Sequence, residues 1–358
     1  MIYLDSAATT FQKPPAVGRA MTEALASMSS PGRGGHPLAM RAADTAFRCR
    51  KELAELFGLD GPEGVAFTLN ATHALNIAIK SLVPPGRRVV ISGYEHNAVT
   101  RPLTALKAKV SVAGGPLFDQ EAAIRAFDEL IAPGVDVVIC NHVSNVFGFI
   151  LPVREIAALC RAHGIPIIVD AAAELPPKAN IRKYLDDGAS LVVFSGGKEI
   201  RGPQASGMIL GSRELIAACE LNCCPNYGIG RPMKVDKENI CGLVKAVELF
   251  VQRDYDQIMA QWDSYVDTIR AGLSDCPGLE MTIGVPTEPG VQPACIRRLF
   301  LRPLTMPAAA LRQALIDGEP SIYTFLYQDQ IVINPQCLQA HELSPIVQAI
   351  RGILMQHR

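Results

Sequence analysis

The chain has 358 residues, of which 49% are hydrophobic and 19% are charged, and its formal net charge is −1. This length exceeds what one small core needs and predicts two domains. The near-neutral charge, without a basic tail or stripe, argues against nucleic acid as a partner. No apolar run reaches the length of a membrane span, so we expect no membrane partner either.

The cysteines and the N-terminal sequence favour a cytoplasmic protein. Ten cysteines are present, but they form no Cys-x-x-Cys pair and no zinc-type cluster with histidine, so we expect free thiols and no metal. The adjacent Cys223 and Cys224 are poorly placed for an ordinary disulfide. The first residues lack a basic segment followed by an apolar one, so no signal peptide is predicted.

The N-terminal part of the sequence predicts a short strand, a loop and two helices. Residues 1–13 begin with an apolar strand and continue with small residues around Ala8, which suit a loop close to a ligand. Ala8 is therefore a candidate substrate contact. Prolines that suit a helix start and apolar residues at helical spacing predict helices over 15–28 and 38–57.

Strands and helices alternate regularly from residue 65 onward. Short apolar runs without alternation are typical of buried parallel strands. Such runs occur at 65–68, 88–91, 135–140, 165–170, 191–198 and 205–210. Helical patterns begin near Asn70 and cover 154–163. This order predicts an α/β fold with a mostly parallel sheet covered by helices on both faces.

We expect the chain to divide near residue 250. The large domain is predicted to cover residues 14–249, and an amphipathic pattern from Ile240 to Leu273 links it to a smaller C-terminal α+β domain at about 250–358. The N-terminal segment 1–13 is expected to pack near the functional site.

Two of the predicted strands end in residues that one chemistry needs together. The run 165–170 ends on Asp170, and the run 191–198 ends on Lys198. The carboxyl ends of parallel strands meet at one edge of a sheet, where ligands bind. A lysine amine condenses with the aldehyde of pyridoxal 5′-phosphate (PLP), and a carboxylate keeps the pyridine nitrogen protonated. The pair predicts PLP as the cofactor, although each residue alone could be an ordinary strand-end aspartate or a surface lysine.

Further polar residues lie near the ends of other predicted strands. Ala71 and Thr72, at a helix N-terminus, and Ser195, before two glycines, suit a phosphate. His96 is placed to stack on the cofactor ring, and Asn145 to hydrogen-bond the ring hydroxyl. Each has a plain alternative, such as a helix cap, a surface histidine or a turn asparagine. Their joint occurrence at strand ends favours the cofactor site.

Two parts of the chain resemble two known families. Residues 2–170 resemble the cysteine desulfurases of the class-V aminotransferase group. The matching segments are 3–10 (YLDSAATT), 31–36 (PGRGGH), 67–76 (FTLNATHALN), 95–97 (EHN) and 144–148 (SNVFG). From Asp170 onward the chain resembles the selenocysteine-synthase-like group, which includes D-glucosaminate-6-phosphate ammonia-lyase. Its matching segments are 170–177 (DAAAELPP), 194–204 (FSGGKEIRGPQ), 228–234 (GIGRPMK) and 333–338 (INPQCL).

The two resemblances agree on fold and cofactor and differ on the reaction. Both groups have the fold-type I architecture of PLP-dependent transferases, so the resemblance implies that fold, PLP, and a homodimer or higher homo-oligomer. Desulfurases carry a glutamine where this chain has Ala173 and a histidine where it has Gly197. Cys337 lies at a plausible distance for their persulfide-forming cysteine, but its neighbours follow the other group's pattern, so a buried structural cysteine is favoured.

The sequence predicts a PLP-dependent lyase or transferase that acts on an amino acid or amino-sugar acid. Lys198 is the expected base for the Cα proton, Asp170 the partner of the ring nitrogen, and His96 an aid to proton transfer. A β-elimination would follow. In the Gly-rich loop 228–234, Arg231 and Lys234 are candidates to bind a substrate phosphate or carboxylate. A cysteine desulfurase or selenocysteine lyase is the alternative, and a non-catalytic protein of this fold is the second.

Overall fold

A computed structural model of the protein describes residues 1–4, 9–32, 34–284 and 295–357. It divides the chain into two compact units, residues 13–253 and residues 1–12 together with 254–358. The long amphipathic stretch is two helices, α9 (Lys237–Gln252) and α10 (Tyr255–Leu273), interrupted at Asp254, whose side chain caps α10 by accepting the N–H of Gln257. This cap fixes the break between the units.

The larger unit is built on a seven-stranded sheet with the order β2-β8-β7-β6-β5-β3-β4. The strands are β2 (Val65–Thr68), β3 (Arg88–Ser92), β4 (Lys109–Ala113), β5 (Val137–Asn141), β6 (Ile167–Asp170), β7 (Leu191–Ser195) and β8 (Gly207–Gly211). The pairs from β4 to β7 are all parallel, and β8 runs antiparallel to both of its neighbours. The predicted mostly parallel sheet is therefore confirmed.

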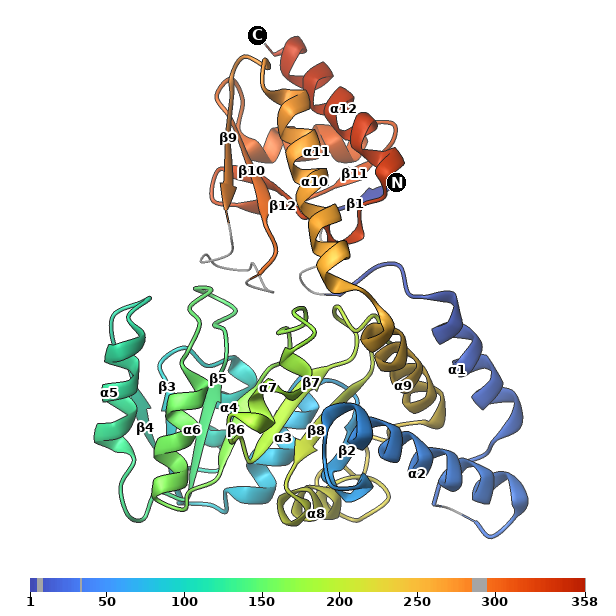
Figure 1. Cartoon of the computed structure of the whole chain (residues 1–358), viewed down its shortest axis with the longest axis vertical. Helices are drawn as coiled ribbons and strands as arrows, with labels where there is room; N and C mark the ends of the chain where they lie inside the picture. The colour runs from blue at the N-terminus through green and yellow to red at the C-terminus, as the bar shows by residue number, and fades with distance from the viewer. Residues whose placement is uncertain (5–8, 33, 285–294, 358) are drawn as a thin grey trace. The chain divides into compact units, whose positions relative to one another are not determined.

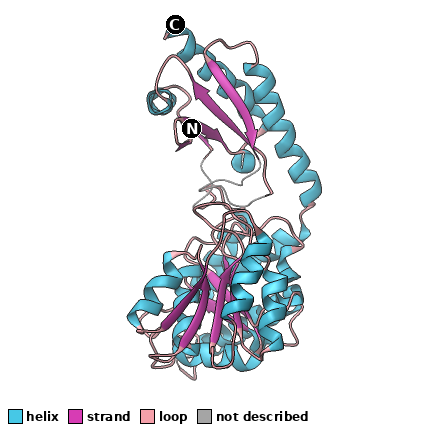
Figure 2. Ribbon diagram, turned by 90° about the vertical axis from the view of Figure 1, so that its left-hand side faces the viewer, coloured by secondary structure: helices cyan, strands magenta, loops and turns pink. Residues whose placement is uncertain are grey.

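Helices cover both faces of this sheet (Figure 2). Apolar residues of α3 (Ala71–Leu82), α4 (Asn97–Ala105) and α8 (Arg213–Asn222) form one core with alternate residues of the strands, such as Val137 and Ile139 of β5. The helices α6 (Val153–Ala162) and α7 (Asn180–Asp186) lie on the opposite side (Figure 1). Burial on both faces explains why the central strands are apolar throughout.

The remaining helices of this unit complete its outer layer. They are α1 (Pro15–Ser27), α2 (Pro37–Phe57), η1 (Pro62–Gly64) and α5 (Gln120–Leu130). Side chains at several helix starts accept a backbone N–H, as Asn70 does for α3 and Asp119 for α5. These caps satisfy donors that a helix N-terminus otherwise leaves open.

The smaller unit is an α+β structure, as expected. Its four-stranded antiparallel sheet has the order β12-β13-β10-β9. The elements are β9 (Leu279–Gly284), β10 (Arg298–Pro303), α11 (Ala308–Asp317), β12 (Phe325–Tyr327), β13 (Gln330–Ile333), η2 (Pro335–Cys337), η3 (Ala340–Glu342) and α12 (Leu343–Gln356). In addition, β1 (Ile2–Tyr3) pairs in parallel with β11 (Ile322–Tyr323), so the first strand of the chain belongs to this unit. Ala8 lies outside the described residues.

Replacing Gly207 with alanine is expected to destabilise the larger unit. A Cβ atom at Gly207 would lie 2.8 Å from the carbonyl carbon of Asn70 and 2.9 Å from Oγ1 of Thr68, where β2 turns into α3. Backbone atoms yield little, so we expect a loss of about 1–3 kcal/mol in the free energy of unfolding. Urea unfolding would measure it. Gly114→Ala is the control, because a Cβ there meets nothing within 4 Å, and an equal effect of both changes would contradict the prediction.

Candidate active site

The polar ends of three neighbouring strands define the candidate site. In the register of the sheet, Asn141 at the end of β5 lies opposite Asp170 at the end of β6, and Asp170 lies opposite Val193 of β7. Lys198 follows β7 by three residues. The ends of β5, β6 and β7 thus bring these side chains to one edge of the sheet, where ligands bind in open α/β folds.

Asp170 and Lys198 interact electrostatically. Burial raises the pKa of the Asp170 carboxyl, while the N–H of Ala172, which donates to Oδ1 at 3.0 Å, and the charges of Lys198 and His96 lower it. Burial lowers the pKa of the Lys198 amine, and the carboxylates of Asp170 and Glu174 oppose that shift. The lysine therefore has an increased tendency to be neutral, which is the form that acts as a nucleophile or a base.

Glu174 is a second acidic neighbour of Lys198 that the sequence did not single out. Its side chain is 4% exposed. Its Oε2 atom lies 3.3 Å from Nδ1 of His142, and that nitrogen lies 2.9 Å from the hydroxyl of Tyr184. The buried carboxylate is thus held by a histidine on the segment after β5. The one available signal was an acidic residue inside the otherwise apolar stretch that follows Asp170.

The start of α3 has the features of a phosphate site. The side chain of Asn70 accepts the N–H of His73, so the first N–H groups of the helix, those of Ala71 and Thr72, lie at its open end. The side chain of Thr72 is exposed. A helix N-terminus with this arrangement attracts an anion.

The turn between β7 and Lys198 is close-packed. A Cβ atom at Gly196 would lie 2.2 Å from Oγ of Ser206, and one at Gly197 would lie 2.9 Å from Cα of Gln204. The two glycines therefore make room for the chain's own segment, beside the half-buried Ser195. Lys13 donates to the carbonyl oxygen of Gly197 at 2.7 Å, which ties the start of the unit to this turn.

His96 lies within electrostatic reach of Asp170 and occupies the N-cap of α4. Its Nδ1 atom accepts the N–H of Ala98 at 3.0 Å. The side chain is exposed. A ring that is fixed at its base and exposed on its face is suited to stack on a flat ligand.

The structure does not connect the other predicted residues to this cluster. Asn145 is exposed in the loop after β5. The guanidinium of Arg231 lies 5.5 Å from the ring centroid of Tyr227, and its NH1 group lies 3.9 Å from Sγ of Cys224. Lys234 is exposed and lines a separate cavity.

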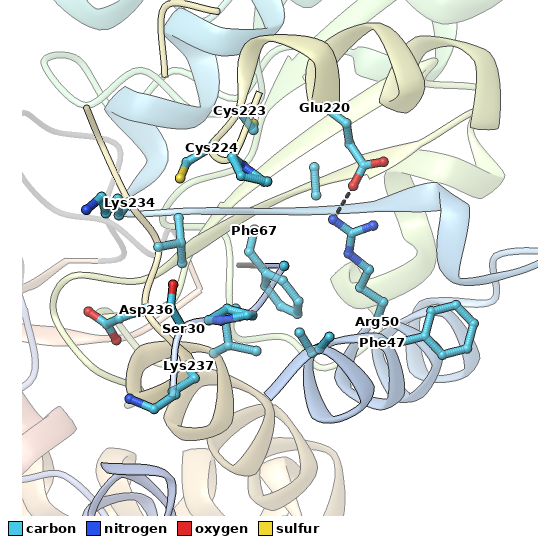
Figure 3. Close-up of a pocket in the computed structure, with 18 of the residues that line it drawn as sticks. Ser30, Phe47, Arg50, Phe67, Glu220, Cys223, Cys224, Lys234, Asp236 and Lys237 are labelled. Atoms are coloured by element: carbon cyan, nitrogen blue, oxygen red, sulfur yellow. Dashed lines mark ion pairs between the residues drawn. The ribbon is translucent and has the colours of Figure 1, made fainter. Parts of the chain in front are cut away.

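This cavity has a volume of about 530 Å³ and is lined by α2, β2 and the segments around residues 30 and 223–240. Figure 3 shows the ion pair of Arg50 and Glu220 on one side of it and Lys234 with Lys237 on the other. Lys198, Asp170 and His96 are not among the lining residues. Within the described residues, no cluster of His, Cys, Asp and Glu could hold a metal ion.

The sequence profile of the family "Aminotransferase class-V" matches residues 2–292, so the chain belongs to the class-V aminotransferase family. The family resemblance expected from the sequence is confirmed. None of the helices in the described part of the chain has the length and apolar character that crossing a bilayer requires.

Curated relatives carry several different names. A "5'-C-glycyluridine monooxygenase-decarboxylase" of a Streptomyces species is 34% identical over 217 residues, which are 58% of this chain and 51% of that protein. A "probable cysteine desulfurase" of Mycolicibacterium paratuberculosis is 28% identical over 80% of this chain and 45% of its own length. A D-glucosaminate-6-phosphate ammonia lyase of Salmonella typhimurium is 32% identical over 57% of this chain and 53% of its own length. The chain spans about half the length of the curated relatives it matches.

Solved structures share the fold over nearly the whole chain. A D-glucosaminate-6-phosphate ammonia-lyase superposes with a TM-score of 0.73 at 21% identity, covering 99% of this chain and 96% of that one. An apo cysteine desulfurase from Thermococcus onnurineus NA1 gives 0.72 at 20% identity, covering 99% and 95%. At such identities the likeness establishes the fold, and the predicted fold class is confirmed.

Proposed function

We propose that the protein is a PLP-dependent lyase that removes the Cα proton of an amino acid or amino-sugar acid and then expels a β-substituent. The observation that carries this proposal is the electrostatic pairing of Asp170 and Lys198 at neighbouring strand ends. PLP, when bound, supplies an electron-withdrawing ring attached to the substrate's nitrogen. We place this reaction in the cytoplasm.

The residues present fit this cofactor in their chemistry. A carboxylate pairs with a protonated pyridine nitrogen, an amine with an aldehyde, and helix N–H groups with a phosphate. Asp170, Lys198 and the start of α3 supply these three partners. His96 and Asn145 would face the ring and its hydroxyl, and Ser195 the phosphate.

Each of these side chains has a role that follows from its surroundings. Lys198 holds and returns the Cα proton, because burial favours its neutral form. The charges of Lys198 and His96 oppose the rise that burial causes in the pKa of Asp170, and its ionised form would hold a proton on the ring nitrogen. The exposed ring of His96 would limit the motion of a bound cofactor and keep water from one of its faces.

A cysteine desulfurase is the second candidate, since several relatives carry that name. That reaction needs a thiolate that attacks the substrate's sulfur. Cys337 is 7% exposed in the smaller unit, which fits the buried cysteine expected from the sequence. Gly197, before the lysine, has no imidazole to move protons. These observations support the lyase over the desulfurase.

Arg231 is our candidate for binding the substrate's anionic group, and the surroundings of its loop support a contribution to a partner subunit. Tyr227, next to this loop, is 91% exposed, and exposed aromatic side chains are enriched at protein interfaces. We therefore propose a homodimer in which residues 228–234 of one subunit reach the other's site. In that arrangement Arg231 and Lys234 need not lie near Lys198 of their own chain.

We expect Cys337→Ser to keep near-wild-type turnover. Arg231→Ala should raise KM by roughly tenfold or more, because it removes a hydrogen bond to a charged group, which contributes about 1.5–3 kcal/mol. The substrate would first be found by screening amino acids and amino-sugar acids for ammonia, keto acid or sulfide release. Steady-state kinetics of both variants would follow. Cys276→Ser and Arg213→Ala serve as controls, being a buried cysteine and an exposed arginine. An inactive Cys337→Ser with a normal Arg231→Ala would replace the lyase with the desulfurase.

A further inference from the structure

A buried polar network lies directly before His96 in the chain. Ser92, at the end of β3, and Asn141, at the end of β5, are 1% and 3% exposed. Oε1 of Glu95 accepts the N–H of Asn141 at 2.9 Å and is also hydrogen-bonded to Oγ of Ser92. The network thus joins the ends of two strands to the residue that precedes His96.

The hydrogen bonds around the Ser92 hydroxyl show which atoms of the network are donors and which are acceptors. Nδ2 of Asn141 donates to the carbonyl oxygen of Tyr94 at 2.8 Å, which fixes the amide so that Oδ1 faces Oγ of Ser92 at 3.0 Å. Tyr94 donates its own N–H to that hydroxyl at 3.2 Å. The single proton of Ser92 therefore faces two acceptors, Asn141 and Glu95.

A proton on Glu95 resolves this conflict. If Oε1 of Glu95 carries a proton, it donates to Oγ of Ser92, and Ser92 donates to Oδ1 of Asn141. Each of these two oxygen–oxygen hydrogen bonds then contains one proton. If Glu95 is ionised, Ser92 serves one acceptor and leaves the other without its donor. The buried Oε2 atom has no hydrogen-bond partner among the described residues, which makes a negative charge there costly.

The electrostatics agree with this count. Burial is the main cause that raises the pKa of Glu95 to about 8, and the charge of Asp170 on β6 adds to it, whereas the hydrogen bonds from Ser92 and Asn141 lower it. The thiol of Cys140 on β5 also interacts electrostatically with Glu95, and burial raises the pKa of this thiol well above its ordinary value. Two carboxyls that interact electrostatically do not ionise together easily, and the charges of Lys198 and His96 favour ionisation of Asp170.

We propose that Glu95 is a positioning residue that remains protonated at neutral pH and, by linking the end of β3 to the end of β5, holds His96 beside Asp170. Loss of the proton breaks the link from Ser92 to Asn141 and releases the start of α4. The inference deepens the proposed function, because it concerns the residues assigned to the cofactor. The network itself belongs to the protein alone, so it can be tested without cofactor or substrate.

The test uses the cofactor-free protein and its Glu95→Gln variant, which is neutral and of the same shape. In D₂O near neutral pH, the infrared spectrum of the wild type should contain a protonated-carboxyl C=O band that the variant lacks and that disappears as pH rises through about 8. The band can be titrated in the wild type alone, so the test survives a variant that fails to fold. Absence of such a band in the wild type would overturn the proposal.

Stability against pH gives an independent readout. The pKa of Glu95 is raised in the folded protein, so its contribution is complete below its ordinary value of 4.5 and is lost as pH rises to about 8. The free energy of unfolding of the wild type, minus that of Glu95→Gln, should therefore fall across this pH window. Its slope against pH should correspond to at most about one proton. Glu63→Gln, an exposed change, is the control and should show no slope. Equal slopes for the two variants would overturn the proposal.

A third measurement, the pH dependence of the His96 NMR signals, separates control of His96 by Glu95 from a purely structural role of Glu95. The imidazole NMR signals of His96, assigned with a His96→Gln variant, should shift in the wild type near pH 8 and lose this step in Glu95→Gln. A step that persists in the variant would show that Glu95 does not control His96. If PLP proves not to bind, these three measurements still decide the role of Glu95.

Discussion

Replacing Lys198 with alanine is expected to leave the fold intact and abolish covalent attachment of PLP. The change removes the amine that pairs with Asp170, and with it the base for the Cα proton. Loss of a positioned base alone costs roughly 10²–10⁴-fold in rate. Visible absorbance of the purified protein, borohydride reduction and peptide mass spectrometry would measure attachment, and circular dichroism would measure the fold.

Lys178→Ala is the matched control, since Lys178 is exposed in the segment that follows β6. It should bind PLP like the wild type. A Lys198→Ala protein that still carries a borohydride-stable cofactor on one peptide would refute the assignment of Lys198 and direct attention to the lysine on that peptide.

Asp170→Asn should bind PLP but slow Cα deprotonation by two or more orders of magnitude. The asparagine keeps an oxygen that can accept the N–H of Ala172, so the strand end should stay in place. It lacks the charge that holds the ring nitrogen protonated, and a buried ion pair of this kind shifts a pKa by units, each worth tenfold. Stopped-flow measurement of solvent exchange at Cα would follow the step. Near-wild-type exchange would contradict the role, and Asp186→Asn, an exposed change, should have none of this effect.

The central strands and the Asp170–Lys198 pair could be predicted because each depends on local sequence. A strand buried on both faces is apolar without interruption, and a polar residue that ends such a run lies at the edge of the sheet. The edge strand β4 was missed because four of its five residues are exposed, so it lacks that pattern. The break at Asp254 was missed because apolar residues continue at helical spacing on both sides of it.

Glu95 and Glu174 lie in segments that carry the family resemblances, but their roles could not be predicted from the sequence, for a different reason. Their environments depend on which strands become neighbours and on which side chains then share protons. The sequence does not show that the Glu95 carboxyl faces Asn141, because these two residues are 46 positions apart in the chain. Arg231 is the opposite case, since its loop was recognised from sequence but the structure does not bring it to Lys198.

The pairing of β1 with β11 also bears on how the protein is made. Residues 2 and 3 are synthesised long before the strand they pair with, Ile322–Tyr323. Residues 13–253 hold all the partners of their own sheet and can fold while translation continues. Strand β1 can pair with β11 only after residues 322–323 have been synthesised. This pairing joins residues more than 300 positions apart, a contact of very high sequence separation. Synthesis of residues 322–323, rather than of residues 2 and 3, therefore sets when the smaller unit can be completed.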